Sequence, residues 1–282
     1  MADTGTKGYV IVTSNTALLR RRLTENAKRI RERIEAACTR TDRDADAIRV
    51  VAVTKYVEMN IVRQALELGI LDLGESRAQQ LNRRAGMVHE LMERRSVLAG
   101  SGGARREAIA GRPRWHMVGH LQRNKVKLVL PWVELIHSVD SIRLAEDLHT
   151  QATKVGRVVD ILLQVNTSAE KSKFGVAVGA VTHMAEHFVA WPGIRLCGLM
   201  TMGPLGATPQ EVRLCFDRLR DIFEDMRGAR YLDSHFKELS MGMSDDFEIA
   251  IEAGATMVRI GSALFEGLTS TAVPSGESED DT

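Results

Sequence analysis

The feature that most constrains the fold is a repeated alternation between short apolar, β-branched runs and longer amphipathic segments. The runs predicted to be strands span residues 48–53, 70–73, 115–118, 135–139, 158–165, 194–200, 238–241 and 257–260. Helical spacing of apolar residues marks segments between them, at residues 59–68, 122–130, 142–155, 178–189, 210–226 and 245–253. Because no hairpin signal joins neighbouring runs, the strands are predicted to run parallel, with helical crossovers.

This rhythm predicts an α/β fold of one domain. About eight strand–helix units in a chain of 282 residues match the count and size of a single (β/α)8 TIM barrel. An open, doubly wound parallel sheet is the alternative. An extra N-terminal helix is predicted to begin at Asn15 or Thr16, with one apolar face made of Leu18, Leu19, Leu23, Ala27, Ile30, Ile34 and Ala37.

Three segments fall outside the barrel pattern, which is assigned to residues 15–268. Residues 1–14 are predicted to be an N-terminal tail, in which residues 9–12 are apolar enough for a short added strand. Residues 94–114 contain a Gly-Ser-Gly-Gly sequence and several arginines, and are predicted to be a flexible insertion. The acidic residues 269–282 are predicted to be a disordered tail.

Composition excludes several classes of protein. A net charge of +1 and an aromatic content of 5% give neither the field nor the stacking surface of a nucleic-acid-binding protein. No apolar stretch approaches the roughly 20 residues of a membrane span, and no signal peptide is visible. The cysteines, Cys38, Cys197 and Cys215, lack paired spacing, and His116 and His120 do not share a helix face, so disulfide and metal sites are not predicted. A cytoplasmic monomer is expected.

Candidate binding residues are those at the carboxyl ends of the predicted strands, where barrels collect their chemistry. Lys55 follows the first strand and Asn166 ends the fifth. An amine that is partly shielded from water has a lowered pKa, and can form an imine with an aldehyde. The pattern equally allows Lys55 to be a lysine that reaches from the strand end into solvent.

A turn within residues 239–247 is a candidate phosphate site. Gly242 permits a tight turn beside Met243, and Ser244 or Asp245 is a natural N-cap for the helix that follows. The unpaired amides of a helix N-terminus and a serine hydroxyl suit a phosphate. A plain capping turn is the alternative.

The last strand supplies an arginine and a second glycine turn. Alternation along this strand places Arg259 on the face opposite to Val258 and Ile260. There it can donate to a pyridine nitrogen, or form a salt bridge with a neighbouring aspartate. The amides of Gly261 and Ser262 can donate to an anion. One lysine, one arginine and two glycine turns together indicate a pyridoxal 5′-phosphate (PLP) site.

These segments resemble the pyridoxal phosphate homeostasis protein family (YggS/PROSC type). The resemblance runs from about Asn15 to Gly267, and it is carried by residues 53–55, 73–75, 115–125, 137–140, 165–168, 173–175, 198–202, 239–246 and 258–262. The sequence departs from the family at Ser76, where an asparagine is usual. The contact made by that asparagine is therefore in doubt here.

The resemblance implies a barrel similar to the N-terminal domain of alanine racemases. It implies a Schiff base between PLP and Lys55, a phosphate held by Ser244 with Gly261 and Ser262, and Arg259 facing the ring nitrogen. The candidate PLP-binding residues also include Asn166 and Met243. The family is regarded as carriers or regulators of PLP without established catalytic turnover, with PLP-dependent apoenzymes as candidate partners.

A PLP-dependent amino-acid racemase is the alternative function, and a barrel that serves as a structural partner without cofactor is a third. An arginine at the ring nitrogen keeps its proton, so the ring is a weak electron sink, although racemases resemble this arrangement. Racemases of this fold also use a tyrosine base. The tyrosines here are Tyr9, Tyr56 and Tyr231, and Tyr56 is expected to point away from Lys55.

Overall fold

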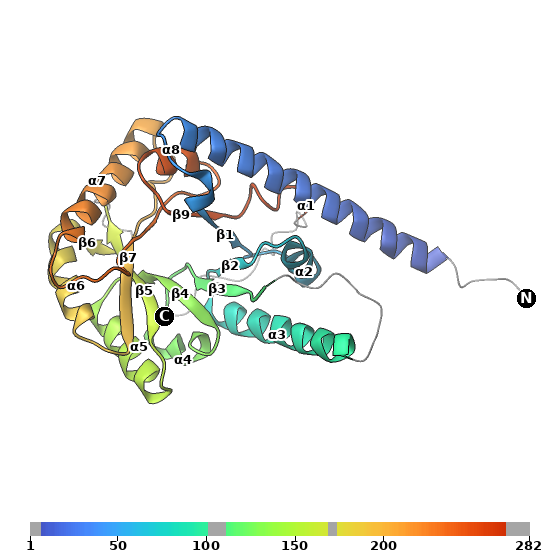
Figure 1. Ribbon diagram of the computed structural model, residues 1–282, viewed down its shortest axis with the longest axis horizontal. Helices are drawn as coiled ribbons and strands as arrows, with labels where there is room; N and C mark the ends of the chain where they lie inside the picture. The colour runs from blue at the N-terminus through green and yellow to red at the C-terminus, as the bar shows by residue number, and fades with distance from the viewer. Residues whose placement is uncertain (1–6, 101–110, 169–173, 269–282) are drawn as a thin grey trace, which may run out of the picture.

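The strands form a closed ring in the computed structural model, which describes residues 7–100, 111–168 and 174–268 and, within these, the side chains of all but residues 7–15 and 96–100. The ring consists of the parallel strands β1 (Arg49–Val53), β2 (Asp72–Glu75), β3 (Arg114–Met117), β4 (Val133–Val139), β5 (Val159–Asn166), β7 (Ile194–Met200), β8 (Glu238–Ser240) and β9 (Met257–Ile260). Pairing of β4 with β5 closes the ring (Figure 1). This confirms the predicted (β/α)8 barrel and excludes the alternative, an open doubly wound sheet. A two-residue strand, β6 (Val176–Ala177), pairs with β5 outside this ring.

Helices cover the outside of the barrel (Figure 1). They are α2 (Met59–Glu67), α3 (Ala78–Gly100), α4 (Val126–Val129), α5 (Ile142–Lys154), α6 (Val181–Val189), α7 (Pro209–Arg227) and α8 (Phe247–Glu252). Short 3-10 turns, η1 (Ala45–Ala47), η2 (Arg123–Lys125) and η3 (Val178–Ala180), precede β1, α4 and α6. The start of α7 shows why such helices begin where they do: Thr208 and Glu211 form a capping box around Pro209 in the first turn.

The N-terminal helix α1 (Lys7–Thr39) completes the helical layer. It packs against α8 and α2, so it covers the barrel beside β9 and β1. Leu23, Ile30 and Ile34 are buried in this contact. The Asn26 amide donates to the carbonyl oxygens of Leu264 and Glu266, at 3.0 Å each, which ties the helix to the segment after β9.

Two predictions about the first helix are wrong, its start and the burial of Leu18. The first helix begins at Lys7, so residues 9–12 are helical and not a tail or a strand. Once a helix is nucleated, each further residue adds a hydrogen bond, and the small propensity cost of β-branched residues does not stop it. Leu18, predicted to lie on the buried face, is 64% exposed.

The predicted insertion at residues 94–114 is also partly wrong. Residues 94–100 continue α3, a helix that was not among those expected, because Glu, Arg, Leu and Ala favour helix until the glycine-rich sequence at Gly100. Arg114 already belongs to β3. Residues 101–110 and the acidic residues 269–282 lie outside the described residues.

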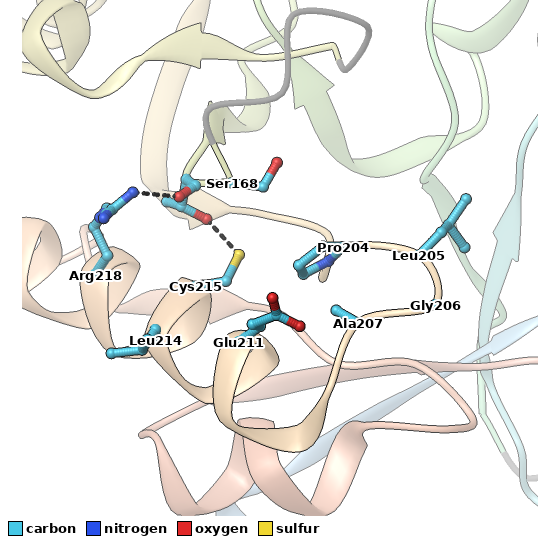
Figure 2. Close-up of a pocket in the computed structure, with 10 residues that line it drawn as sticks. Ser168, Pro204, Leu205, Gly206, Ala207, Glu211, Leu214, Cys215 and Arg218 are labelled. Carbon is cyan, nitrogen blue, oxygen red and sulfur yellow. Dashed lines mark hydrogen bonds between the residues drawn. The ribbon is translucent and has the colours of Figure 1, made fainter.

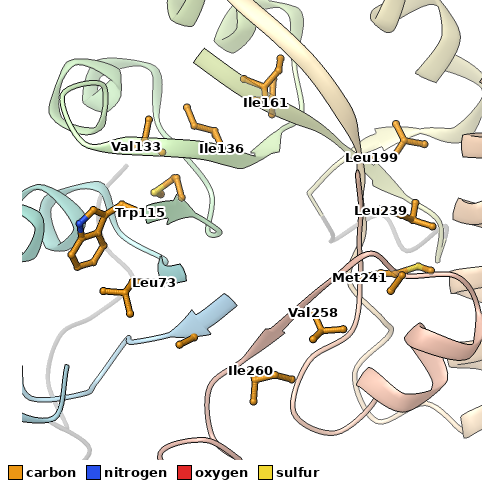
Figure 3. Packing of buried hydrophobic residues seen from close by; sticks show 14 of the residues in the cluster. Leu73, Trp115, Val133, Ile136, Ile161, Leu199, Leu239, Met241, Val258 and Ile260 are labelled. Carbon is orange, nitrogen blue, oxygen red and sulfur yellow. The ribbon is translucent and has the colours of Figure 1, made fainter. Parts of the chain in front are cut away.

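The buried side chains form two layers. A large cluster fills the space between the strands and the helices, and contains Leu73, Ile136, Ile161, Leu199 and Val258 (Figure 3). A smaller cluster lies inside the ring and consists of Val51, Leu135, Leu162, Cys197, Met200 and Met257. Met257 is in the inner cluster while Val258 is in the outer one, so the predicted alternation along β9 is confirmed. Buried polar side chains, among them Arg259, His116 and His137, also lie in the interior.

Candidate functional site

An oxygen-centred cradle joins the turn after β8 to the turn after β9. The Ser244 hydroxyl accepts hydrogen bonds from the amides of Gly261 and Ala263, at 3.2 Å each. The two N–H groups therefore converge on one oxygen, which is the geometry that an anion requires. Ser244 is 9% exposed, whereas Ser262, beside it, is exposed to solvent. The structure thus brings Ser244 and Gly261 together, as the family resemblance implied.

The turn between β8 and α8 requires glycine at position 242. Gly242 has φ +92°, and a Cβ added there would lie 2.5 Å from the Ala250 Cβ and 2.9 Å from the Phe247 Cα. The predicted N-cap is wrong: the cap residue of α8 is Asp246, and its carboxylate accepts from the Met243 amide at 2.5 Å. Because the helix begins at Phe247, the Ser244 hydroxyl is left to face the second turn.

Arg259 lies inside the barrel and is 3% exposed. Its Nη1 donates to the Ser240 hydroxyl at 2.7 Å, and its Nη2 donates to the Thr201 carbonyl at 2.9 Å. Burial lowers the pKa of Arg259 to about 10, while the charge of Asp246 acts in the opposite direction. The guanidinium stays protonated at neutral pH, and it is fixed by two neutral oxygens, one on the neighbouring strand β8 and one just after β7.

Lys55 leaves the barrel beside the second turn. Ala52 of β1 pairs with Ile260 of β9, so Lys55 and Gly261 emerge from neighbouring strands at the same end. Of the two arrangements that the sequence allowed for Lys55, the structure shows the solvent-exposed one. The lysine follows the strand and does not lie in it, so its stem extends past the rim.

Tyr56 differs from the expectation that it points away from Lys55. Its φ of +64° is unusual for a residue that is not glycine, and turns the chain sharply after β1. The Tyr56 ring is 67% exposed, and its centroid lies 5.9 Å from the Lys55 Nζ. Two exposed side chains that can ionise or donate therefore stand together at the rim.

A buried ion pair holds the base of this turn. Arg84 of α3 donates to the Glu75 carboxylate at 2.6 Å, to the carbonyl of Thr54, and to the carbonyl of Val57 at 2.6 Å. The Thr54 hydroxyl donates to the same carboxylate. The bonded carbonyls lie on either side of Lys55, so Arg84 fixes the turn from both ends. Neither Glu75 nor its partner Arg84 was among the predicted site residues.

The departure at Ser76 lies next to this ion pair. Gly119, which follows β3, approaches the Ser76 backbone so closely that an added Cβ would lie 2.3 Å from the Ser76 carbonyl oxygen. The Ser138 hydroxyl donates to the Gly119 carbonyl at 2.5 Å. The main-chain contact at position 76 therefore depends on glycine opposite it, and not on the serine side chain.

A chain of buried histidines crosses the interior, and sequence reasoning missed it. His116 Nε2 lies 3.0 Å from Asp72 Oδ1, His116 Nδ1 lies 3.0 Å from His137 Nε2, and His137 Nδ1 lies 2.9 Å from the Ser240 hydroxyl. Both rings are fully buried. Burial lowers the pKa of His116 and lowers that of His137 well below its usual value. Period-two alternation along β3 and β4 was the signal that places both rings inside.

Asn166 and Met243 are the remaining predicted site residues. Asn166 ends β5, and its side-chain oxygen accepts from the Ser168 hydroxyl at 3.1 Å. Met243 lies in the turn before Ser244 and is partly buried. The roles of both residues in binding stay predictions.

A separate cavity of about 460 Å³ opens beside this rim (Figure 2). Thr167, which follows Asn166, lines it together with residues of the loop after β7 and of α7. Arg218 donates to the Thr167 carbonyl at 2.7 Å, across the cavity wall. Lys55, Arg259 and the Ser244 cradle do not line this cavity, so its size alone does not mark the candidate site.

Comparison with known proteins places the chain in a family. Residues 21–268 match the family model of the alanine racemase N-terminal domain. The chain is 34% identical over 242 residues to a pyridoxal phosphate homeostasis protein of Aquifex aeolicus, an alignment that covers 86% of this chain and 96% of that protein. The chain belongs to the pyridoxal phosphate homeostasis family.

Further members support this assignment. The pyridoxal phosphate homeostasis protein of Escherichia coli is 32% identical over 243 residues, covering 86% of this chain and 95% of that protein. The structure of PipY from Synechococcus elongatus, with PLP bound, is 29% identical, has a TM-score of 0.64, and is covered over 99% of its length by 84% of this chain. The shared part is therefore the whole barrel.

Neither a metal-binding cluster nor a membrane-spanning helix occurs within residues 7–100, 111–168 and 174–268. Histidine, cysteine and acidic side chains do not gather there into a group that could hold a metal ion. None of the helices in those ranges has the length and apolar character of a membrane span.

Proposed function

We propose that this protein binds PLP and acts in intracellular PLP homeostasis, with Lys55 as the residue that bonds to the cofactor. The Lys55 amine would hold the cofactor, because PLP would supply an aldehyde carbon to which an amine can bond with loss of water. Support comes from the names of the relatives and from PLP in the PipY structure. The observation that carries the proposal is the position of Lys55 beside an anion cradle on the neighbouring strand.

The donor set fits each part of PLP. The amides of Gly261 and Ala263 already converge on an oxygen, that of Ser244, and the exposed Ser262 lies between them. In the proposal these groups hold the phosphate. Arg259 supplies a hydrogen-bond donor for the ring nitrogen from inside the barrel. Asn166 and Met243 complete the proposed site at the rim.

The proposal is a carrier without catalytic turnover. When bound, PLP supplies an electrophilic carbon and an electron-withdrawing ring. Arg259 keeps its proton at neutral pH, so it donates a hydrogen bond to the ring without protonating it, and the ring stays a weak electron sink. Lys55 is exposed, which lets water and an acceptor reach the bond and weakens electrostatic catalysis.

Two further parts of the proposal rest on composition and on family membership. The carrier is a cytoplasmic monomer, and PLP-dependent apoenzymes are its recipients. An amino-acid racemase that uses the same lysine is the competing function. The family model named for the alanine racemase N-terminal domain supports a shared barrel, and the chemistry has to be measured.

Titration with PLP tests this function. Wild-type protein is expected to develop the absorbance band of a PLP Schiff base, and Lys55→Met, which keeps the stem but lacks the amine, is expected to lose it. Lys154→Met is the matched control, because Lys154 ends α5 just before β5 begins, at the end of the barrel opposite to the rim. Equal bands in wild type and Lys55→Met would refute the assignment. Rapid racemisation of L-alanine or L-serine would show that the protein is a racemase and not a carrier.

A further inference from the structure

The polar interior of the barrel is one continuous chain of hydrogen bonds. It starts at Arg259 on β9, passes through Ser240 on β8, and crosses the interior to His137 on β4. It continues through His116 on β3 to Asp72 on β2. The contact from β8 to β4 joins strands that are not neighbours in the ring, so this link spans the inside of the barrel.

The far end of the chain is a carboxylate with fixed charge. Arg114 donates to both oxygens of Asp72, at 2.7 Å and 2.5 Å. Burial by itself raises the pKa of Asp72, but the hydrogen bonds from Arg114 and His116 outweigh it and hold that pKa below its usual range. Asp72 is therefore an acceptor only, and His116 has to present an N–H to it.

This requirement fixes the proton on every ring nitrogen along the chain. A neutral imidazole carries one N–H, so when His116 Nε2 donates to Asp72, its Nδ1 must accept. The donor it accepts from is the Nε2–H of His137. The Nδ1 of His137 then accepts from the Ser240 hydroxyl, and the Ser240 oxygen accepts from Arg259, which has no acceptor of its own.

We infer that His116 and His137 are positioning residues for Arg259: both rings are neutral Nε2–H tautomers, and every hydrogen bond from Arg259 to Asp72 is donated in the same direction. The chain of hydrogen bonds turns the guanidinium of Arg259 toward the rim. It makes the orientation of that group depend on the Asp72–Arg114 ion pair at the amino-terminal ends of β2 and β3. This inference rests on the proposed function where it concerns PLP. The proton positions themselves do not depend on PLP.

The opposite arrangement of protons reverses the hydrogen bonds between His116 and Ser240. If His116 carried two protons, its Nδ1–H would donate to His137, and His137 Nδ1–H would donate to Ser240. The Ser240 oxygen would then receive donors from both sides, and a second positive charge would lie in an interior that already holds Arg259. Arg49, Arg114 and Arg259 each lower the pKa of at least one of the two histidines, and Asp72 is the charge that raises that of His116.

Histidine ¹⁵N NMR on the wild-type protein without PLP tests the proton positions directly. Both rings are expected to show a protonated Nε2 and a bare Nδ1 near neutral pH, with His116→Gln and His137→Gln used to assign the signals. A proton on His137 Nδ1, or a doubly protonated His116, would overturn the inference. Because the measurement needs no cofactor, it remains decisive even if Lys55 does not bind PLP.

Variants then test whether the chain positions Arg259. Ser240→Ala breaks the link and is expected to weaken PLP binding roughly tenfold, the effect of about 1.4 kcal/mol. Ser138→Ala is the matched control, because it removes a buried hydroxyl that donates to Gly119 and lies outside the chain. If wild type binds PLP and both variants bind it as tightly, the hypothesis that the hydrogen-bond chain positions Arg259 is wrong, while the proposed PLP site is still supported. If the wild type fails to bind PLP, the proposed function fails and the tautomers decide the inference alone.

Discussion

The ion pair beneath the Lys55 turn gives the most quantitative prediction. Glu75 is 0% exposed, and the Arg84 side chain that neutralises it is 12% exposed. Arg84→Met leaves a buried carboxylate without its cation and removes donors from the carbonyls of Thr54 and Val57. Removing one partner of a buried pair costs about 3–5 kcal/mol, so we expect a free energy of unfolding lower by about 4 kcal/mol. At roughly 2–4 °C per kcal/mol, the melting temperature falls by about 8–16 °C.

Urea unfolding of the wild type and three variants decides this prediction. Arg21→Met is the control, because its pair with Glu25 is exposed and is expected to change stability by about 0.5 kcal/mol or less. Adding Glu75→Gln to Arg84→Met removes the uncompensated charge, so the double variant is expected to be more stable than Arg84→Met alone. A loss below about 1 kcal/mol for Arg84→Met, or a double variant that is less stable still, would refute the reasoning.

Two more predictions concern the cradle and the interior. Gly242→Ala places a methyl group against Ala250 and Phe247 at φ +92°, so a loss of about 2–4 kcal/mol in urea unfolding is expected, with weaker PLP binding; unchanged stability would contradict the close approach. The lowered pKa values of His116 and His137 mean that the unfolded chain binds more protons than the folded protein below about pH 6.5. Stability is therefore full above that pH and falls below it, by up to about 1.4 kcal/mol per pH unit for each histidine; unfolding energies that stay constant from about pH 7.5 to 5.5 would show the rings are not buried and neutral.

The barrel was predictable because its strands are marked by their own composition. The strands at Ile194–Met200 and Met257–Ile260 lie where the apolar runs predicted them. β2 does not: the run at residues 70–73 is shifted to Asp72–Glu75. Glu75 is a poor strand former by itself, and it is buried there because Arg84 on the next helix neutralises it. That compensation is a tertiary contact, and no local pattern reports it.

In the candidate site, too, local sequence patterns predicted some features, whereas others depend on tertiary structure. Alternation predicted that Arg259 lies on the face opposite to Val258 and Ile260, and the family resemblance implied that Ser244 lies beside the Gly261 turn. The exposure of Lys55 depends on the direction of a turn, which the left-handed conformation of Tyr56 sets. Periodicity carries no information about that angle.

The buried histidines were hidden for a different reason. His116 and His137 lie 21 residues apart, each within an apolar run. Their contact exists because β3 and β4 are neighbours and present one face to the interior. Their link to Ser240 further requires the ring to close, so sequence spacing alone does not show it.

The proposed function depends on the bond between Lys55 and PLP. Borohydride reduction followed by peptide mapping measures this bond most directly. Reduction makes the Schiff base permanent and marks the lysine that carried it. We expect the pyridoxyl group on the peptide that contains Lys55, in an amount proportional to the fraction of protein with PLP bound. A pyridoxyl group on another lysine, with the Lys55 peptide unmodified, would contradict it.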